Sequence, residues 1–345
     1  MILCGILAEP AMLAVLGLSG DAVMIDGHLR GGARSGLARQ GWPTLAPGGQ
    51  TAAVRVVPNL AVARYAAVMG LTPRDTAQGP VLGLGCGGAD GPWHRDLAVE
   101  IARQLLAAPA LTPPDLLAAR LPMIGTWASS RLRAMNGPGS GAPVVAPRGA
   151  DDVQWHACKT TYQGFFTAQE WQLSHRFHNG KMGPVVKREA FISGDAVVIL
   201  PWDPVRDRVL VIEQFRVIPA LRGDPQPWQI EAIAGRIDAG ETPEQAGIRE
   251  AREEAALTIR DLIPAAHVYA SPGTVTEYLY QFVGITDLPD DATGVYGLES
   301  EAEDIRGHLL NRRDLSDMLA AGQVSNGPLA LLSLWLDANH ARLRG

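Results

Sequence analysis

The strongest constraint on this chain is the segment 235–257, GRIDAGETPEQAGIREAREEAAL. Thr242 is followed by Pro243 and, three residues after the threonine, by Gln245. This order is typical of a helix start, with an N-cap, a proline at the first helical position and the second half of a capping box. We therefore expect a helix that begins here and runs to about Ala256.

Three glutamates lie on nearly one face of this expected helix. Glu254 is four residues after Glu250, and Glu253 is three residues after it. Arg249 and Arg252 offset part of the repulsion between the carboxylates. One interpretation is a solvated surface helix held by salt bridges. The density of carboxylates instead favours a site for Mg²⁺ or Mn²⁺, which take oxygen ligands and share them with substrate phosphates.

The spacing of the whole segment resembles the Nudix box of the Nudix hydrolases. Gly235 is followed after five residues by Glu241, and after seven more by the run 249–257, REAREEAAL. Two positions depart from the family pattern: Ala256 replaces a glycine, and Ala251 replaces a larger aliphatic residue. Glycine would end the helix with a positive φ, so we expect a weaker helix end and an intact set of carboxylates.

The flanking segments narrow the resemblance to the ADP-ribose pyrophosphatase branch of that family. The matching elements are the runs 212–216 (IEQFR), 271–277 (SPGTVTE) and 301–305 (EAEDI), together with Pro227-Trp228, Glu231 and Ala234-Gly235. The similarity covers about residues 155–340. It implies an α/β fold, the Nudix α/β/α sandwich with a mixed sheet. It also implies a homodimer whose subunits exchange N-terminal strands, and residues 155–190 would be the exchanged segment.

The resemblance also implies an activity, the Mg²⁺-dependent hydrolysis of ADP-ribose to AMP and ribose 5-phosphate. A related nucleoside diphosphate sugar, a dinucleoside compound or NADH is the nearest alternative substrate. Metal, with Mn²⁺ as a possible substitute for Mg²⁺, would neutralise the phosphates and activate a water molecule. A different class of function remains open, that of a nucleotide-binding sensor or interaction protein.

Each expected site residue has a role by resemblance. Glu250, Glu253 and Glu254, with the backbone carbonyl of Ala234, would bind the metal. Glu277 would be the general base, the alternative being a solvated loop residue. Arg216 would bind phosphate, unless it pairs structurally with Glu213 or Glu231. Glu231 would hold the adenine or ribose end, Arg249 would orient the carboxylates, and Glu241 would fix the loop.

Composition limits the partners. The 345 residues carry a formal net charge of −6, which argues against a general nucleic-acid binder. Three scattered cysteines predict no disulfide framework and fit a reducing cytoplasm. No stretch has the length of a transmembrane helix, and the apolar N-terminus lacks the basic region of a signal peptide. We expect no membrane partner and a nucleotide sugar as ligand.

The N-terminal part shows a second resemblance. Strands are expected at 2–7, 21–26 and 52–57, and helices at 10–16, 61–69 and 96–107. The run 4–7 (CGIL), with Pro10, Leu13 and the run 42–45 (WPTL), resembles the gamma-glutamylcyclotransferase (AIG2-like) family over residues 1–105. That family needs a glutamate, but Met69-Gly70 stands in its place, and methionine cannot move a proton. The resemblance therefore implies a degenerate, inactive domain.

The rest of the chain gives the domain plan. The run 83–88 (GLGCGG) predicts a glycine-rich turn in preference to a dinucleotide fingerprint. A helix bent at Pro122 is expected over 112–134, followed by a linker without periodicity. His175 and His178 favour a hairpin end over a metal pair. We expect a smaller α+β domain at 1–108, a helix and Gly/Pro-rich linker at 109–152, and the Nudix domain at 153–345.

Overall fold

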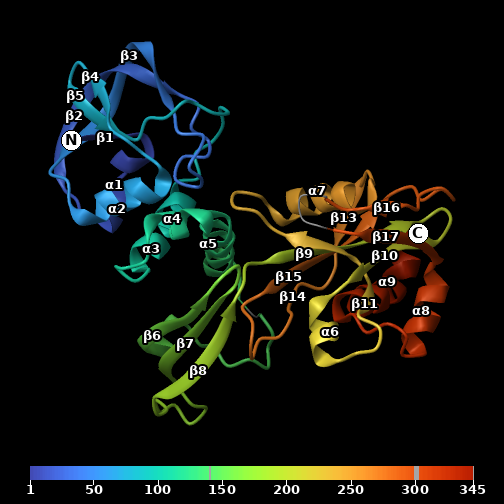
Figure 1. The fold of residues 1–345 in the computed structure, drawn as a ribbon. Helices are drawn as coiled ribbons and strands as arrows, with labels where there is room; N and C mark the ends of the chain where they lie inside the picture. Colours follow the sequence, from blue (N-terminus) through green and yellow to red (C-terminus); the bar gives the residue numbers. More distant parts are fainter. Residues whose placement is uncertain (140, 299–302, 345) are drawn as a thin grey trace.

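The computed structural model describes residues 1–139, 141–298 and 303–344 of a mixed α/β protein. Figure 1 shows the N-terminal sheet and its helices in one lobe and a large sheet with its own helices in another, with a three-stranded sheet beside them. Of the acidic run 301–305, residues 301 and 302 lie outside the described residues.

The N-terminal sheet has five strands in the order β2-β3-β1-β5-β4. Only β1 and β5 run parallel. The strands are β1 (Ile2–Cys4), β2 (Gly20–Arg30), β3 (Thr44–Val56), β4 (Arg74–Thr76) and β5 (Gly79–Leu82). The run 83–88 follows β5 as an irregular loop with bends at Gly83 and Cys86, and no helix begins between it and Arg95 in this described stretch.

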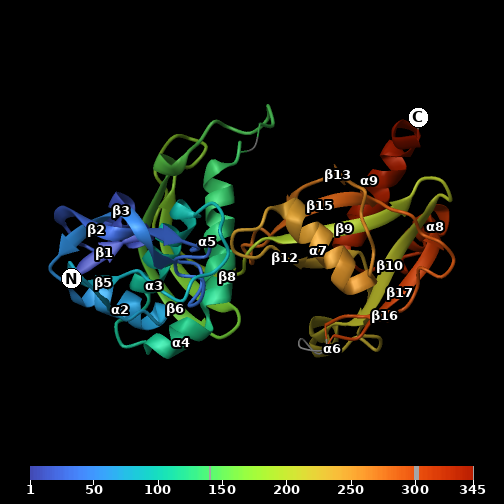
Figure 2. The ribbon, with the colours of Figure 1, turned by 90° about the horizontal axis from the view of Figure 1, so that it is seen from above.

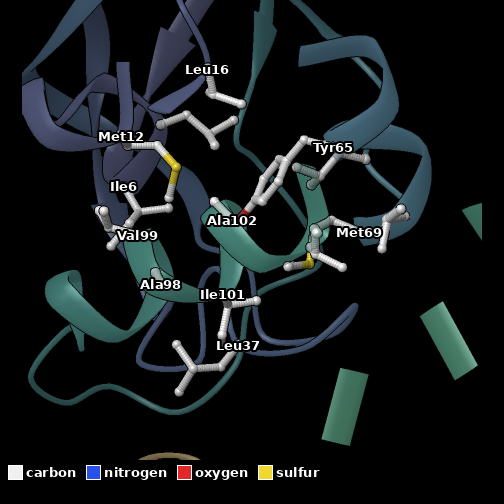
Figure 3. Close-up of a cluster of buried hydrophobic side chains, with 14 of the residues drawn as sticks. Ile6, Met12, Leu16, Leu37, Tyr65, Met69, Ala98, Val99, Ile101 and Ala102 are labelled. Atoms are coloured by element: carbon white, nitrogen blue, oxygen red, sulfur yellow. The ribbon is translucent and has the colours of Figure 1, made fainter. Parts of the chain in front are cut away.

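Several helices pack together in the same lobe as this sheet. They are the 3-10 helix η1 (Gly5–Ala8), α1 (Pro10–Val15), α2 (Leu60–Met69), α3 (Arg95–Ala107), α4 (Pro114–Ala119) and α5 (Leu121–Asn136). Their buried side chains form one hydrophobic core with β1, in which Met12, Tyr65, Met69 and Ile101 meet (Figure 3). The same core includes Ile124 and Ala128 of α5.

Two N-terminal elements differ from those expected from the sequence. The strand expected at 2–7 ends at Cys4, because Gly5 takes φ +59° and the chain turns into η1. The bent helix expected at 112–134 is two helices separated at Arg120. Pro122 lies in the first turn of α5, where a missing N–H costs no helical hydrogen bond.

A separate three-stranded antiparallel sheet follows the 3-10 helix η2 (Ala150–Asp152). It consists of β6 (Val153–Gln163), β7 (Thr167–His175) and β8 (Val186–Ile192), in that order. An isolated bridge joins Arg176 to Met182, so the segment holding His178 is a hairpin end, as predicted.

The C-terminal lobe is built on a mixed nine-stranded sheet. Strand β15 runs parallel to β9, and the other pairs are antiparallel. The strands are β9 (Ala196–Asp203), β10 (Arg208–Phe215), β11 (Trp228–Glu231), β12 (Ile233–Arg236), β13 (Asp261–Pro264), β14 (Val268–Tyr269), β15 (Tyr278–Ile285), β16 (Val295–Tyr296) and β17 (Ile305–Asn311).

Helices cover both faces of this sheet. On one face α7 (Pro243–Ala255) buries Ala246 and Ala251 against Val197 and Ile199 of β9. On the other face α8 (Arg312–Ala320) and α9 (Gly327–Arg344) pack on Val198 and its neighbours. Because successive residues of β9 point to opposite faces, its continuous apolar run fills both cores. The short helix α6 (Val217–Arg222) lies beyond the end of β10. The result is an α/β/α sandwich (Figures 1 and 2).

Candidate active site

The central strands separate at the end of the sheet where the predicted site residues gather. Strands β9 and β10 pair only through Asp203–Arg208 and Trp202–Val209. Beyond these pairs β10 takes β11 as its partner, and β9 takes β12. The chain therefore crosses from one separated strand to the other at Ala232, which joins β11, ending at Glu231, to β12, which contains Ala234.

Helix α7 has the start that the sequence predicts. Thr242 accepts a hydrogen bond from the backbone N–H of Gln245 (3.2 Å), and the Gln245 side chain accepts from the N–H of Thr242 (2.9 Å). The helix packs its Glu250 carboxyl directly on Gly235, where an added Cβ would lie 1.9 Å from Oε1. Glycine at position 235 leaves the space that the Glu250 carboxyl occupies.

Arg249 makes hydrogen bonds to several residues of the site. It donates two hydrogen bonds to Glu241 (3.0 and 2.9 Å) and one to the carbonyl of Arg236 (2.9 Å). Its Nη1 donates to Glu250 Oε1 (2.6 Å) and to Glu253 Oε2 (3.1 Å). One guanidinium thus ties the loop before α7 to two carboxylates on the helix.

The two buried carboxyls of α7 lie in an environment that disfavours their negative charge. Burial raises the pKa of Glu250 to about 7, although Arg249 opposes the shift. Burial and then the charge of Glu250 raise the pKa of Glu254 well above its ordinary value. The charge of Glu303 adds to both effects.

Each of the three glutamates keeps an oxygen available. Glu254 Oε2 accepts from the N–H of Ala234 (3.1 Å), while Glu250 and Glu253 each use one oxygen on Arg249. Among the described residues, the second oxygen of each carboxylate has no hydrogen-bond donor. In the same part of the chain, no group of three His, Cys, Asp or Glu side chains is already arranged to enclose a metal ion.

Arg216 and Glu231 meet across the pair β10–β11. Arg216 donates through Nε to both oxygens of Glu231 (3.1 Å each) and through Nη2 to Oε2 (2.7 Å). Glu231 is buried, and Arg216 is partly exposed. The alternative that Arg216 pairs with Glu231 is therefore realised in this structure, while Glu213 instead contacts His308 (2.8 Å).

Glu277 lies at the same end of the sheet as Arg236. It directly precedes β15, whose Leu279 pairs with Ala196 of β9, and Ala196 pairs with Arg236 of β12. Burial raises the pKa of Glu277, and the positive charge of Arg236 opposes that shift. Its side chain accepts no hydrogen bond from the described residues.

Arg236 was not predicted as a site residue. Its guanidinium lies over the rings of Phe165 and Phe166 (5.5 and 4.9 Å to the centroids) and donates to Ser193 Oγ (2.8 Å). Glu303 was recognised only as part of an acidic run. Arg236 is one of the five residues between Gly235 and Glu241, to which the spacing of the segment assigns no role, so local spacing gave no signal for it.

Comparisons with known proteins agree with this geometry. The NUDIX domain family model matches residues 193–328. The ADP-ribose pyrophosphatase of Escherichia coli (strain K12) is 39% identical over 196 residues, which cover 57% of this chain and 93% of that protein. This chain belongs to the Nudix family. It is a Nudix hydrolase similar to ADP-ribose pyrophosphatase.

Two further curated relatives of this Nudix hydrolase are similar over the same lobe. The ADP-ribose pyrophosphatase of Haemophilus influenzae is 34% identical over 195 residues, covering 56% of this chain and 89% of that protein. The GDP-mannose pyrophosphatase of Escherichia coli (strain K12 / DH10B) is 32% identical over 162 residues, covering 46% of this chain and 83% of that protein. A solved structure described as an ADP compounds hydrolase is 21% identical, with a TM-score of 0.42, and covers 56% of this chain and 98% of its own.

Two further observations concern the cysteines and the lengths of the helices. All three cysteines are free, Cys4 buried and Cys86 and Cys158 exposed. Among the described residues, no helix combines the length and apolar character needed to cross a membrane.

Proposed function

We propose that this Nudix hydrolase cleaves the diphosphate bond of ADP-ribose to give AMP and ribose 5-phosphate. The observation that carries the proposal is the helix α7, whose three glutamates each keep an oxygen available beside the pair Arg216–Glu231. The similarity to ADP-ribose pyrophosphatases over most of their length supports ADP-ribose as the substrate. A related nucleoside diphosphate sugar such as GDP-mannose is the second substrate class.

The carboxylates of α7 fit a divalent cation. The charge of Glu250 raises the cost of ionising Glu254, the charge of Glu253 raises that of Glu250, and the charge of Glu303 adds to both. Such a set favours Mg²⁺ or Mn²⁺, with Glu250, Glu253, Glu254 and the carbonyl of Ala234 as ligands. The bound metal would neutralise the diphosphate and lower the pKa of the attacking water.

The remaining roles fall to this chain's own side chains. Glu277 is partly desolvated, which brings its pKa closer to the working pH of a general base that takes the proton of the attacking water. Arg216 presents a partly exposed guanidinium to the phosphates, and Glu231 fixes its orientation. Arg249 positions Glu250 and Glu253 without contacting substrate.

The test is phosphate release after phosphatase coupling, with ADP-ribose, GDP-mannose, ADP-glucose, NADH and diadenosine polyphosphates as substrates. We expect strong turnover of ADP-ribose only when Mg²⁺ is present, and none from Glu254→Gln, which keeps the shape and removes the charge. Equal rates for Glu254→Gln and the natural protein would overturn the metal assignment. Nucleotide binding without turnover of any substrate would favour a sensor.

The N-terminal lobe is included in the proposal as a catalytically inactive relative of gamma-glutamylcyclotransferases. Glu100 is the buried carboxylate of its core, and its oxygens accept from Arg131 (2.8 Å), Gln104 (3.3 Å) and Arg103 (3.4 Å). Held in this way, it is not free to move a proton. We expect no 5-oxoproline from gamma-glutamyl compounds, and its formation would contradict this part of the proposal.

A further inference from the structure

Helix α5 reaches from the N-terminal core to the first residues of the Nudix sheet. Ser130 Oγ donates to Asp195 Oδ1 (2.6 Å), and Arg133 Nε donates to Asp195 Oδ2 (2.8 Å). Asp195 is 3% exposed, so its carboxylate depends on these two partners. Figure 1 shows α5 between the two lobes.

Asp195 in turn holds the loop that precedes the catalytic helix. Its backbone carbonyl accepts from the N–H of Ile237 (3.2 Å). The adjacent carbonyl of Arg236 accepts from Arg249 (2.9 Å), which binds Glu250 and Glu253. The path from Arg133 to the carboxylates of α7 is therefore a short series of hydrogen bonds.

The same loop also packs against the N-terminal lobe. Ala239 joins the hydrophobic core of that lobe, and a Cβ on Gly125 of α5 would lie 2.8 Å from the Cβ of Ala239. A Cβ on Gly240 would lie 3.3 Å from His94 and 3.5 Å from Leu37. Segment 237–241 thus has N-terminal residues against it from α5, from the start of α3 and from the segment before β3.

We propose that the N-terminal lobe is a positioning element for the Nudix site, in which Ser130, Arg133 and Gly125 of α5 fix the loop 237–241 and, through Arg249, the carboxylates of α7. Small displacements of catalytic groups have large effects on rate because the reacting atoms must be held in near-attack geometry. The inference adds positioning residues outside the Nudix segment, and its activity readout rests on the proposed ADP-ribose hydrolysis.

The test compares Arg133→Ala with Arg131→Ala in the full chain. Arg131 lies on the same helix and makes an ion pair of the same length, 2.8 Å, but its partner Glu100 belongs to the N-terminal core. We expect Arg133→Ala to lower kcat for ADP-ribose about tenfold and to change KM less than about twofold. The substitution would displace the carboxylates of α7 and leave the residues that bind the substrate in place. Arg133→Lys should recover part of kcat, and Arg131→Ala should leave kcat unchanged.

Hydrogen–deuterium exchange supplies a readout that does not need turnover. The amide of Ile237 should exchange faster in Arg133→Ala than in the natural protein and in Arg131→Ala, because its acceptor is no longer fixed. If the natural protein does not hydrolyse ADP-ribose, the proposed function fails, and this exchange measurement alone decides the inference. Unchanged exchange of segment 237–241, with unchanged kcat, would overturn it.

Gly125→Ala is a second variant that removes no ion pair. The new Cβ must displace Ala239, while alanine favours the helix. We expect a folded protein, because the gain in helix propensity offsets part of the cost of displacing Ala239, together with a loss of kcat. Full activity in this variant would contradict a positioning role for α5 even if Arg133→Ala fails to fold.

Discussion

Ala256 ends α7 in a conformation that suits glycine. Its φ is +51° and its ψ +28°, and its N–H donates to the carbonyls of Ala251 and Arg252. A left-handed conformation costs a residue with a Cβ roughly 1–2 kcal/mol. We expect Ala256→Gly to raise the free energy of unfolding by about 1 kcal/mol and to leave kcat unchanged, because the glutamates are already in place. Denaturant unfolding measures the first and phosphate release the second.

Ala255→Gly is the matched control for that prediction. Ala255 is buried in the last turn of the helix with helical geometry, so glycine there should lower the free energy of unfolding by about 1 kcal/mol. A loss of stability in both variants would show that the left-handed conformation at Ala256 is not strained.

The buried carboxyls of α7 predict a dependence of stability on pH in metal-free protein. The pKa of Glu250 is raised to about 7, so the folded state binds a proton more tightly than the unfolded state. The stability from this group is complete below its ordinary pKa and is lost as pH rises through about 7. We expect a lower melting temperature at pH 8 than at pH 6 in EDTA, and a larger stabilisation by Mg²⁺ at pH 8.

Glu250→Gln separates this effect from other titrating groups. The variant cannot ionise at that position, so its melting temperature in EDTA should fall less between pH 6 and pH 8. An identical fall in both proteins would exclude Glu250 as the source.

Residues of the site differ in how far sequence could predict them. The glutamates of α7 follow from a local pattern, because helical spacing alone places them on one face. Arg236 could not be predicted in this way, since its partners Phe165, Phe166 and Ser193 come from distant segments. The pairing of Arg216 with Glu231 was one of two open alternatives and depended on the register of β10 with β11.

At the scale of elements, the loop before α7 and the helix itself act together through Arg249. Arg249→Lys keeps a positive charge but cannot bridge Glu241, Glu250, Glu253 and the Arg236 carbonyl at once. We expect kcat to fall about tenfold, since the carboxylates lose their orientation. Steady-state kinetics should show the change, whereas Arg252→Lys, on the exposed side of the helix, should behave as the natural protein.

The helices and the central strands could be predicted because their signals are local. The N-cap at Thr242 and the apolar runs of β9 and β10 gave bounds within a residue or two of those observed. The hairpin β2–β3 is longer than expected, because the pairing of its glycine-rich tip depends on the partner strand and not on composition.

The arrangement of the whole molecule was the feature least predictable from the sequence. The domain limits at 108 and 152 stay a prediction, and α5 contributes side chains both to the N-terminal core and to the contact with Asp195. Contacts between distant segments have no periodic signature in either segment. The contact between α5 and the start of β9 depends on the tertiary fold and could not be predicted from either segment alone.

The three-stranded sheet is the basis of a prediction that the protein forms a dimer. Trp155 and Tyr162 of β6 are 63% and 62% exposed, and most residues of this strand are exposed to solvent in the single chain. Large exposed aromatic groups on one element are typical of a protein interface. Because the resemblance to strand-exchanging homodimers assigns residues 155–190 to such an exchange, a second copy of the chain is the expected partner. We expect a dimer of twice 36.7 kDa by light scattering, and a monomer for Trp155→Lys. Val57→Lys, at an apolar residue 84% exposed outside this sheet, should remain dimeric. A natural protein that scatters as a single chain would exclude the dimer, and Trp155 and Tyr162 would then need another partner to cover them.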